Sequence, residues 1–523
     1  MRASLVFALC AALLLSACGA PAAPSSPAAP GDSPTAAVPT NQPSAAPSAG
    51  SGELRIGTGL SIPASLIASE GQNGFNMITY GAGETLMRLT PEQELVPWLA
   101  ESVERADPTT WEVTLRPGVT FHDGTPLTAR AVANSFASSW AGLPNAGSFV
   151  PTDTRILVRD ELHLAFITPE PLGNFRYSLA NWNFVIHKAP VNSISPMTGP
   201  YRPVSLVVDQ EFVLERFADY WGGAAGLERI RVLRLPDANA RALALQSGDL
   251  DMLTNVAPEI ARGLPLEIAQ VSLPGTRLHH IILNHTRAPF DERAVREAAS
   301  LAIDREALLL ATLDGQGEVA VSLYPASLGL PLVQAQRYDP EQARALLDEA
   351  GWVPGADGVR VKDGQRLEVL LYSYPGRPEI TQMAVVIQAM LGEVGFAVAV
   401  EEVADVVEMA EGGDFQATMF SVGVQSDPLY MPALTLTEGG AFNYGGYWSA
   451  PIEALVAQLR AEDDPAARAE LARQVQEVVR TDTPNIYLAT PPLITAFRQG
   501  HVVGFTPNPN DLYLVTPELG LSQ

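Results

Sequence analysis

Short stretches in which apolar and polar residues alternate predict several β-strands. Leu54-Arg55-Ile56 begins one such stretch, Trp111–Arg116 alternates before the Pro117-Gly118 turn, and Ile230–Leu235 alternates again. Alternation sends successive side chains to opposite faces of a strand, so that one face is buried. We therefore expect strands near the start of the folded body and again in its middle.

Helix starts follow these strands. Asp237 precedes a helical stretch that ends at Gly248, and it follows the alternating run Ile230–Leu235. Asp339-Pro340 combines a capping carboxylate with proline at the first helical position, before an apolar stripe that stops at Gly351. Two further starts are expected, at Asp291 and at Asp464-Pro465. Strands that alternate with helices predict an α/β fold.

Length and composition narrow the class of protein. A chain of 523 residues with 47% hydrophobic and 17% charged residues can bury a large interior in two to four domains. Its 33 basic and 58 acidic side chains give a net charge of -25. Because a field of that sign repels phosphate backbones, we expect no nucleic-acid partner.

The N-terminal residues predict export and a lipid anchor. Arg2 is followed by an apolar run from Leu5 to Leu15, which is too short to span a bilayer. The run ends in Leu15-Ser16-Ala17-Cys18-Gly19, which resembles a bacterial lipobox. We interpret 1–17 as a lipoprotein signal peptide and Cys18 as the lipidated residue; the alternative is a core helix that happens to end in cysteine.

A tether is expected to separate the lipid from the folded body. Residues 18–52 consist largely of Pro, Ala, Ser and Thr, which bury too little apolar surface to fold. The chain has two cysteines, and Cys10 leaves with the signal peptide while Cys18 carries lipid. The folded body therefore has no thiol for a disulfide, a zinc cluster or a nucleophile. We place the protein in the cell envelope, on the outer face of the cytoplasmic membrane or in the periplasm.

The sequence contains few candidates for catalysis. It has no phosphate-binding loop, no Gly-x-Ser-x-Gly turn and no His-Glu-x-x-His pair. His279 and His285 would share one strand face about 20 Å apart, with His280 on the other, so they cannot hold one ion. His122-Asp123-Gly124 is typical of a turn. We expect no catalytic residues, metal ligands or cofactor, although the 58 carboxylates leave open a hydrolase that uses two of them.

An aromatic, glycine-rich stretch leaves two readings open. Phe442–Trp448 contains too many glycines for a helix core. It is either a loop that packs on the body or a loop that lines a ligand cleft.

From about Glu53 to about Pro507 the chain resembles the extracytoplasmic solute-binding proteins of ABC importers, in the class that binds peptides and nickel. The resemblance is carried above all by Leu95–Ser102 and by the string Leu115–Thr128, which contains Phe121-His122-Asp123-Gly124-Thr125-Pro126. Further matching stretches are Thr198–Tyr201, Leu245–Asp251, Asn284, Pro289–Asp291, Val295–Ala298 and Ala302–Arg305.

The resemblance implies a bilobed α/β clamshell of the type II periplasmic-binding-protein kind with an extra inserted domain. Domain I would comprise 53–87, 198–275 and 490–523, domain II would be the insertion 88–197, and domain III would be 276–489. We keep these names for these ranges below. The lobes would close on a solute by a hinge motion.

The resemblance also implies where the solute binds. The expected cleft residues are Phe75, Asn76, Met77, Tyr201, Asn284, His285, Gly423, Val424, Gln425, Ser426, Asp427, Tyr444 and Trp448. Asp427 has an alternative role as the cap of a helix that Pro428 begins.

One departure from the family bears on the ligand. Dipeptide and oligopeptide binders carry an aspartate for the peptide α-ammonium at the position of Val424, and valine offers no such partner. Nickel-type binders supply a histidine in the following loop, and this chain has none between His285 and His501.

The resemblance implies a substrate-binding lipoprotein of an ABC importer and not an enzyme. Its solute would be peptide-like, a nickel or other metal chelate, or opine-like. Its partners would be the permease subunits with their ATPase and, through its N-terminal lipid, the membrane, and the protein would be monomeric. A secreted carboxylate-dependent hydrolase and a solute-sensing receptor without transport are the alternatives.

Overall fold

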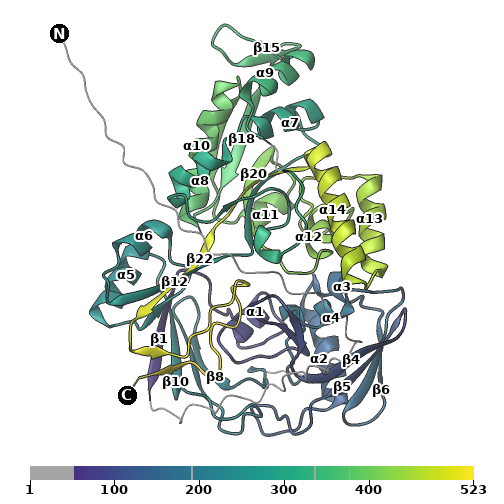
Figure 1. The fold of residues 1–523 in the computed structure, drawn as a ribbon, viewed down its shortest axis with the longest axis vertical. Coiled ribbons are helices and arrows are strands. Elements are labelled where there is room, and N and C mark those ends of the chain that lie inside the picture. The colour runs from purple at the N-terminus through teal and green to yellow at the C-terminus, as the bar shows by residue number, and fades with distance from the viewer. Residues whose placement is uncertain (1–51, 190–192, 335–336, 376, 523) are drawn as a thin grey trace, which may run out of the picture. The chain divides into compact units, whose positions relative to one another are not determined.

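The computed structural model describes residues 52–189, 193–334, 337–375 and 377–522 (Figure 1). The predicted signal peptide, Cys18 and almost all of the tether lie outside these ranges. Among the helices that the structure describes, none is long and apolar enough to cross a membrane.

A seven-stranded sheet is built from the three segments of domain I. Its order is β12 (Ile268–Pro274), β22 (Pro492–Arg498), β11 (Met252–Leu253), β1 (Glu53–Thr58), β10 (Arg229–Arg234), β9 (Glu211–Arg216) and β8 (Tyr201–Val207). β1 runs parallel to β10 and β11, and the remaining pairs are antiparallel. The alternating residues Leu54 and Ile56 are fully buried in its core, as the pattern predicted. The strands come from all three ranges assigned to domain I, whose exact limits remain a prediction.

The strand-to-helix unit of domain I forms as expected. α5 (Ala238–Ser247) follows β10, and the amide of Ala240 donates to Asp237 Oδ1 at 2.7 Å. The helix stops at Gly248, whose φ of 84° is readily adopted by glycine. Capping residues and hydrophobic alternation therefore specify this unit locally.

Domain II contains a four-stranded antiparallel sheet. Its order is β4 (Ala100–Asp107), β5 (Thr110–Leu115), β7 (His163–Ile167) and β6 (Arg155–Val158), and α2 (Ala129–Gly142) contributes to the same core. The segment around His122 is the expected turn, because the Phe121 amide donates to the Thr125 carbonyl at 2.8 Å. The His122 ring bonds the Gly199 carbonyl at 3.0 Å and thereby joins domain II to domain I.

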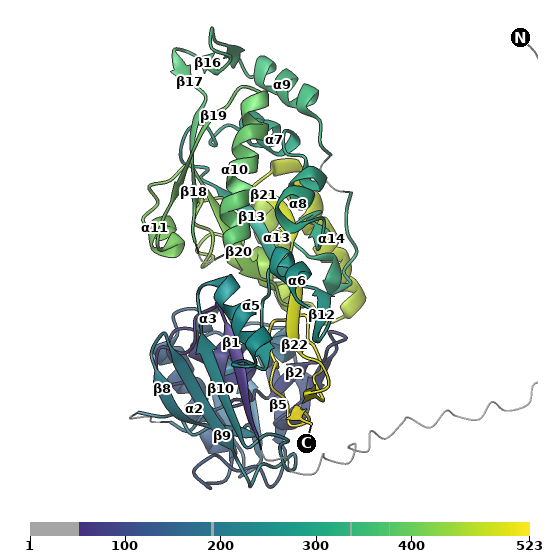
Figure 2. The ribbon, with the colours of Figure 1, turned by 90° about the vertical axis from the view of Figure 1, so that its left-hand side faces the viewer.

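Domain III is organised around a six-stranded sheet. Its order is β14 (Glu318–Val319), β21 (Asn485–Thr490), β13 (Arg277–Leu283), β20 (Ala417–Gly423), β18 (Glu368–Ser373) and β19 (Ala397–Glu402). Neighbouring residues of β13 point to opposite faces: Ile281 joins a core with α8 (Arg305–Leu313) and α10 (Pro378–Glu393), and Ile282 joins another with α13 (Ala450–Ala461) and α14 (Pro465–Asp482). Helices therefore cover both faces of this sheet (Figure 2).

The helix starts in domain III were predicted with one error. α9 (Pro340–Glu349) and α14 are capped by Asp339 and Asp464, whose carboxylates accept from backbone amides at 2.9 and 2.8 Å. The start at Asp291 was wrong by one residue, since α7 (Arg293–Leu301) has Glu292 at its cap position without a side-chain cap bond. Asp291 instead ends a turn, where its amide donates to the Arg287 carbonyl.

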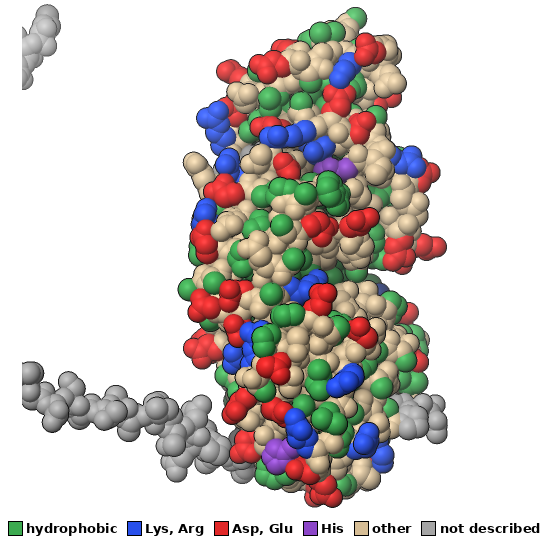
Figure 3. All heavy atoms as spheres, turned by 90° about the vertical axis from the view of Figure 1, so that its right-hand side faces the viewer, with side chains coloured by type: hydrophobic (Ala, Val, Ile, Leu, Met, Phe, Trp, Pro, Cys, Tyr) green, Lys and Arg blue, Asp and Glu red, His purple; other side chains and the backbone are tan. Residues whose placement is uncertain are grey.

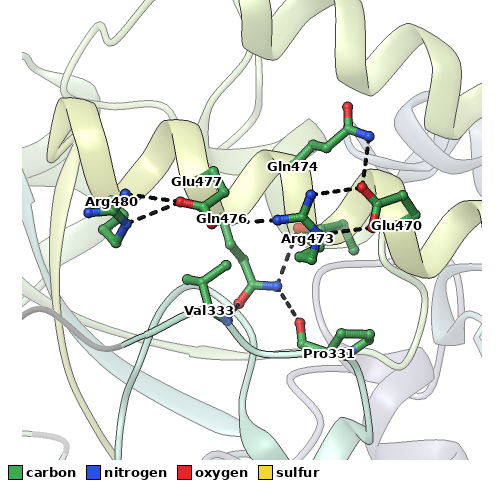
Figure 4. Close-up of polar contacts among 9 residues, drawn as sticks. Pro331, Val333, Glu470, Arg473, Gln474, Gln476, Glu477 and Arg480 are labelled. Atoms are coloured by element: carbon green, nitrogen blue, oxygen red, sulfur yellow. Dashed lines mark hydrogen bonds and ion pairs between the residues drawn. The ribbon is translucent and has the colours of Figure 1, made fainter.

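A buried glutamine ties α14 to the loop before α9. Gln476 accepts from the Ser322 hydroxyl at 2.8 Å. It also donates to the Pro331 carbonyl at 2.8 Å (Figure 4). The outer face of the same helix carries Glu470, Arg473, Glu477 and Arg480 as successive ion pairs. On the face drawn in Figure 3, acidic and basic side chains are likewise interspersed.

Two chain segments cross between the sheets of domains I and III. β12 and β22 pair as far as Pro274 and Pro492, and β13 and β21 continue the pairing from His279 and Ala489. A Cβ at Gly275 would lie 2.7 Å from the Pro491 carbonyl oxygen, so glycine permits the close approach. These paired crossings are the covalent hinge between the two domains.

Candidate functional site

A cavity opens in domain I beside the ends of its sheet. It has about 590 Å³ of empty space, part of it open to solvent. Its apolar lining includes Leu60, Phe75, Leu493, Phe505, Leu512 and Leu514, and its polar lining includes Asn76, Thr254, Asn255, Asn508 and Asp511. A mostly apolar cavity with a few polar groups suits a small organic ligand.

The helix α1 (Asn73–Thr79) supplies two of the predicted residues to this cavity. Phe75 and Asn76 line it, and the Phe75 ring meets Trp182 edge-on with centroids 6.4 Å apart. Met77 lies on the other side of the helix and is fully buried in the domain I core. The helix period thus separates three consecutive predicted residues into two that face the cavity and one that does not.

An acidic residue connects the cavity with domain III. Asp511 lines the cavity and accepts from the Asn255 amide at 3.2 Å. Its other carboxylate oxygen lies 3.7 Å from Nη2 of Arg277, the first residue of β13. A basic group from the opposite sheet therefore lies next to one of the residues that line the domain I cavity.

Two arginines lie close to each other at this junction. The side chains of Arg277 and Arg377, the residue before α10, are 23% and 15% exposed. Burial and the charge of Arg377 lower the pKa of Arg277 to about 10, so the Arg277 guanidinium is charged at neutral pH. Nη1 of Arg377 is 3.9 Å from Glu379, and both ion pairs are longer than hydrogen bonds. These guanidinium groups therefore retain N–H donors that can form hydrogen bonds with an anion.

Glu379 and His279 lie next to each other beside the arginine pair Arg277 and Arg377. The His279 ring is fully buried in β13, bonds the Ser421 hydroxyl at 3.0 Å and lies 3.5 Å from Glu379 Oε1. Burial lowers the pKa of His279 and keeps the ring neutral. Burial opposes ionisation of Glu379, but the adjacent His279 and the charge of Arg377 hold the pKa of Glu379 below its usual range. The Glu379 carboxylate is therefore ionised beside Arg377, and its charge can orient the Arg377 guanidinium.

Among the described residues, no three His, Cys, Asp or Glu side chains are grouped as a metal site. The arrangement places the charged Arg277 next to Asp511, which lines the largely apolar cavity. Such a surface can bind and orient an amphipathic organic anion.

Several predicted residues do not line this cavity. Tyr201 is fully buried and its hydroxyl accepts from the Leu227 amide at 3.2 Å. Asn284 donates to the Phe415 carbonyl at 2.9 Å, and His285 bonds the Pro484 carbonyl at 2.9 Å. Burial lowers the pKa of His285 to about 4. The contacts of these three residues fasten loops and strands within one domain.

The aromatic stretch is a packed loop with one exposed ring. Tyr444 lies 5.9 Å from Phe420, ring to ring, and packs against the core around α13 and α14. Trp448 is 60% exposed. Neither residue lines the domain I cavity.

The segment Gly423–Asp427 begins beside Arg277 and ends at domain II. Gly423 pairs with Arg277 across β13 and β20, and a Cβ there would lie 3.6 Å from Arg277 Nη2. Val424 is 2% exposed in the core. The last three residues bond Asn181, Gln93 and Asn174 of domain II. Asp427 does not cap a helix, because α12 (Tyr430–Thr435) has Leu429 at its cap position.

Sequence reasoning did not find Arg277, Arg377, Glu379 or Asp511. The available signals were a charged residue at the start of an otherwise apolar strand and the Arg377-Pro378-Glu379 helix start. Most charged residues in such positions face solvent, so these signals do not single out a site. The four residues come together only because the chain crosses twice between the sheets.

Comparison with known proteins places these features in a family. Residues 94–443 match the family model described as bacterial extracellular solute-binding proteins, family 5 Middle. The nickel-binding periplasmic protein of Escherichia coli is 30% identical over 346 residues, which cover 60% of this chain and 64% of that protein. The nickel-binding protein NikA of Staphylococcus aureus is 25% identical over 84% of this chain and 89% of its own length.

Solved structures have the same fold. NikA of Staphylococcus aureus, crystallised with Ni(L-His)2, superposes with a TM-score of 0.80 at 23% identity, over 90% of this chain and 100% of that chain. The oligopeptide-binding protein AppA of Bacillus subtilis, in complex with a nonapeptide, gives 0.79 at 23% identity over 91% and 100%. The expected bilobed α/β fold of type II is confirmed.

Proposed function

We propose that this chain, which belongs to the bacterial extracellular solute-binding proteins of family 5, captures a small organic solute with an anionic group and delivers it to an ABC importer. The family consists of binding proteins. Within it, the proposal concerns the kind of solute, the lipid anchor and the permease.

The pair formed by Arg277, which lies 3.7 Å from the cavity residue Asp511, and the neighbouring Arg377 is the observation that carries this proposal. Two like charges repel each other, and their ion pairs at 3.7 and 3.9 Å do not use all guanidinium donors. A solute carboxylate between them would gain charge-assisted hydrogen bonds, and its apolar part would enter the cavity. Peptide-like acids, opine-like conjugates and metal complexes of organic acids all have this chemistry.

Val424 disfavours an ordinary peptide with a free α-amino group. It is buried in the domain III core, so it offers neither a charge nor access at the position where peptide binders are expected to hold the ammonium. Nickel is the cargo named for two relatives. A metal carried by this chain would arrive as a complex whose organic ligand supplies carboxylates to the arginines.

The N-terminus supports the remaining parts of the proposal. Lipid on Cys18 and the tether 18–52 would hold the body outside the cytoplasmic membrane, near the permease. A receptor that senses the same solute without transport would need the same cavity, and deletion of the gene for this protein, followed by measurement of solute uptake, separates the two roles. Loss of uptake supports transport, whereas unchanged uptake supports sensing.

Native mass spectrometry of the protein purified without added solute tests the proposal. A stoichiometric extra mass that disappears on denaturation, and that fragments as an organic acid, is the expected result. A bare protein that also shows no thermal shift with peptides, opines and nickel chelates would refute it. Release of a chemically changed solute would favour the hydrolase alternative.

A further inference from the structure

Residues Gln425–Asp427, at the end of β20, contact domain II and not the solute cavity. Gln425 Oε1 accepts from the Asn181 amide at 3.3 Å, and the Ser426 hydroxyl donates to Gln93 Oε1 at 2.6 Å. Asp427 Oδ2 accepts from the Asn174 amide at 2.7 Å. Three consecutive residues of domain III therefore each bond a different residue of domain II.

Asp427 is the centre of this contact. It is 5% exposed, and its Oδ1 accepts from Arg468 and from the Leu429 amide. Arg468 is held in turn by the Leu459 carbonyl at 2.6 Å. Because these bonds lie within domain III, they orient the Asp427 carboxylate independently of Asn174. Domain II adds one hydrogen bond to this buried carboxylate, from the side-chain amide of Asn174.

The backbone beside Asn174 reaches domain III at close range. The Gly173 amide donates to the Arg460 carbonyl at 2.7 Å, in the last turn of α13. A Cβ built on Gly173 would lie 2.0 Å from the Glu462 carbonyl oxygen. Only glycine permits this approach, since the atom it meets is backbone. The junction lies where α3 (Ala146–Phe149) and α4 (Phe175–Ser178) meet the ends of α13 and α14 (Figure 1).

Side chains at the rim extend the contact. Arg105 of β4 forms an ion pair with Asp463 at 2.5 Å. The Phe149 ring stacks on Tyr430, with centroids 5.7 Å apart and an interplanar angle of 22°. The interface thus combines a buried polar centre with an aromatic and a charged edge.

The same segment also adjoins the basic pair. Gly423 faces Arg277, and only Val424 separates it from Gln425. Tyr430, which stacks on domain II, lies close enough for the charge of Arg277 to act on its hydroxyl. A change at the solute carboxylate can therefore reach the domain II contact through one short, rigid stretch of chain.

We propose that Gln425–Asp427 and the loop Gly173-Asn174 form a closure latch, which populates the closed form of the protein even without solute. The inference rests on the proposed function only in assuming that the closed form is the one that holds solute. The latch assigns Gln425, Ser426 and Asp427 to closure, although the family resemblance implied that they contact solute.

A steric variant tests the latch without touching the cavity. In Gly173→Ala the new methyl group collides with the Glu462 carbonyl only when domains II and III are in contact, so the variant is expected to fold but not to close. Gly392→Ala in α10 is the matched control, because a Cβ there meets nothing within 4 Å. Asn174→Asp is a second variant, which places a carboxylate against Asp427. Circular dichroism melts verify folding of all three.

Single-molecule energy transfer reports closure. The chain has cysteines only at positions 10 and 18, so Leu157→Cys in domain II and Val353→Cys in domain III, both at exposed positions, accept dyes in the folded body. In solute-free protein we expect a high-transfer state in the wild type and in Gly392→Ala, and at least a tenfold smaller closed-to-open ratio in the two latch variants. An unchanged ratio in these variants, or a wild type without the high-transfer state, would overturn the latch.

The outcome is separable from that of the proposed function. A failed solute screen combined with loss of the high-transfer state in Gly173→Ala refutes the solute proposal and supports the latch. Solute binding combined with full closure of Gly173→Ala does the reverse.

Discussion

The Arg277 guanidinium lies 3.7 Å from the Asp511 carboxylate, and this ion pair spans the junction between domain III and the domain I cavity. Arg277 begins β13 directly after the chain crosses from β12, so its position depends on the hinge as much as on its own strand. Arg277 therefore connects the domain I cavity with one of the segments that cross between the sheets.

Arg377→Gln should weaken solute binding without unfolding the protein. The substitution removes a charged donor whose side chain is 15% exposed, and a hydrogen bond to a charged group contributes about 1.5–3 kcal/mol. We expect the dissociation constant of the solute recovered from the protein to rise about 10- to 150-fold. Titration calorimetry measures it. Arg287→Gln, at an exposed arginine, is the control, and equal affinity in both variants would contradict the assignment.

Asp251→Ala should destabilise domain I strongly. The buried carboxylate accepts from Arg55 Nε at 3.0 Å and Nη2 at 2.8 Å, and Arg498 lies 3.4 Å away. Removing this carboxylate takes away charge-assisted hydrogen bonds from Arg55, whose side chain is 30% exposed, and costs about 1.5–3 kcal/mol. Urea denaturation should reveal this loss, and the exposed neighbour variant Asp249→Ala should stay near the wild type. A similar midpoint for both variants would disprove the role of Asp251.

Glu84 should make the protein less stable as the pH rises from about 4.5 to about 7. Burial raises the pKa of Glu84 to about 7, although hydrogen bonds from Trp221, Thr198 and Tyr220 oppose the shift. The folded protein therefore binds more protons than the unfolded chain in this window, and stability falls with increasing pH. The loss should be on the order of 3 kcal/mol.

Glu84→Gln should remove this part of the pH dependence. The difference in unfolding free energy between variant and wild type, measured in urea from pH 4 to 8, isolates it from buried histidines such as His122. Burial lowers the pKa of His122 to about 4, which makes stability rise with pH. A difference that does not vary with pH would show that the pKa of Glu84 is the same in the folded protein and in the unfolded chain.

Cys18→Ser should release the protein from the membrane. Acyl chains on Cys18 contribute about 0.8 kcal/mol for each buried CH₂ group, and the variant has no thiol to acylate. Fractionation of cells should move the variant to the soluble envelope or medium fraction, while Cys10→Ser should remain membrane-bound. Equal partitioning of both variants would argue against the lipid anchor.

Local physical chemistry made much of the fold predictable. Asp237, Asp339 and Asp464 each accept a bond from a backbone amide three residues ahead, and the alternating Leu54 and Ile56 are buried. These features depend only on neighbouring residues. The Asp291 start failed because Glu292, one residue later, adopts the cap conformation.

The candidate site was only partly predictable, because its residues come from distant parts of the chain. Phe75 and Asn76, which the family resemblance gave as cleft residues, line the cavity, whereas Met77, one residue further along the same helix, faces the core. The resemblance gave Tyr201 and Asn284 as cleft residues, but their polar atoms form hydrogen bonds with the backbone of Leu227 and Phe415.

The sequence by itself determined the α/β class, the expected export and the family, because capping, alternation and short motifs are encoded by adjacent residues. Only the tertiary structure decided that Asp511 meets Arg277, 234 positions earlier in the chain, and that Asp427 meets Asn174. Such contacts depend on how the chain crosses between its sheets and domains, and no local sequence pattern specifies which distant residues then come together.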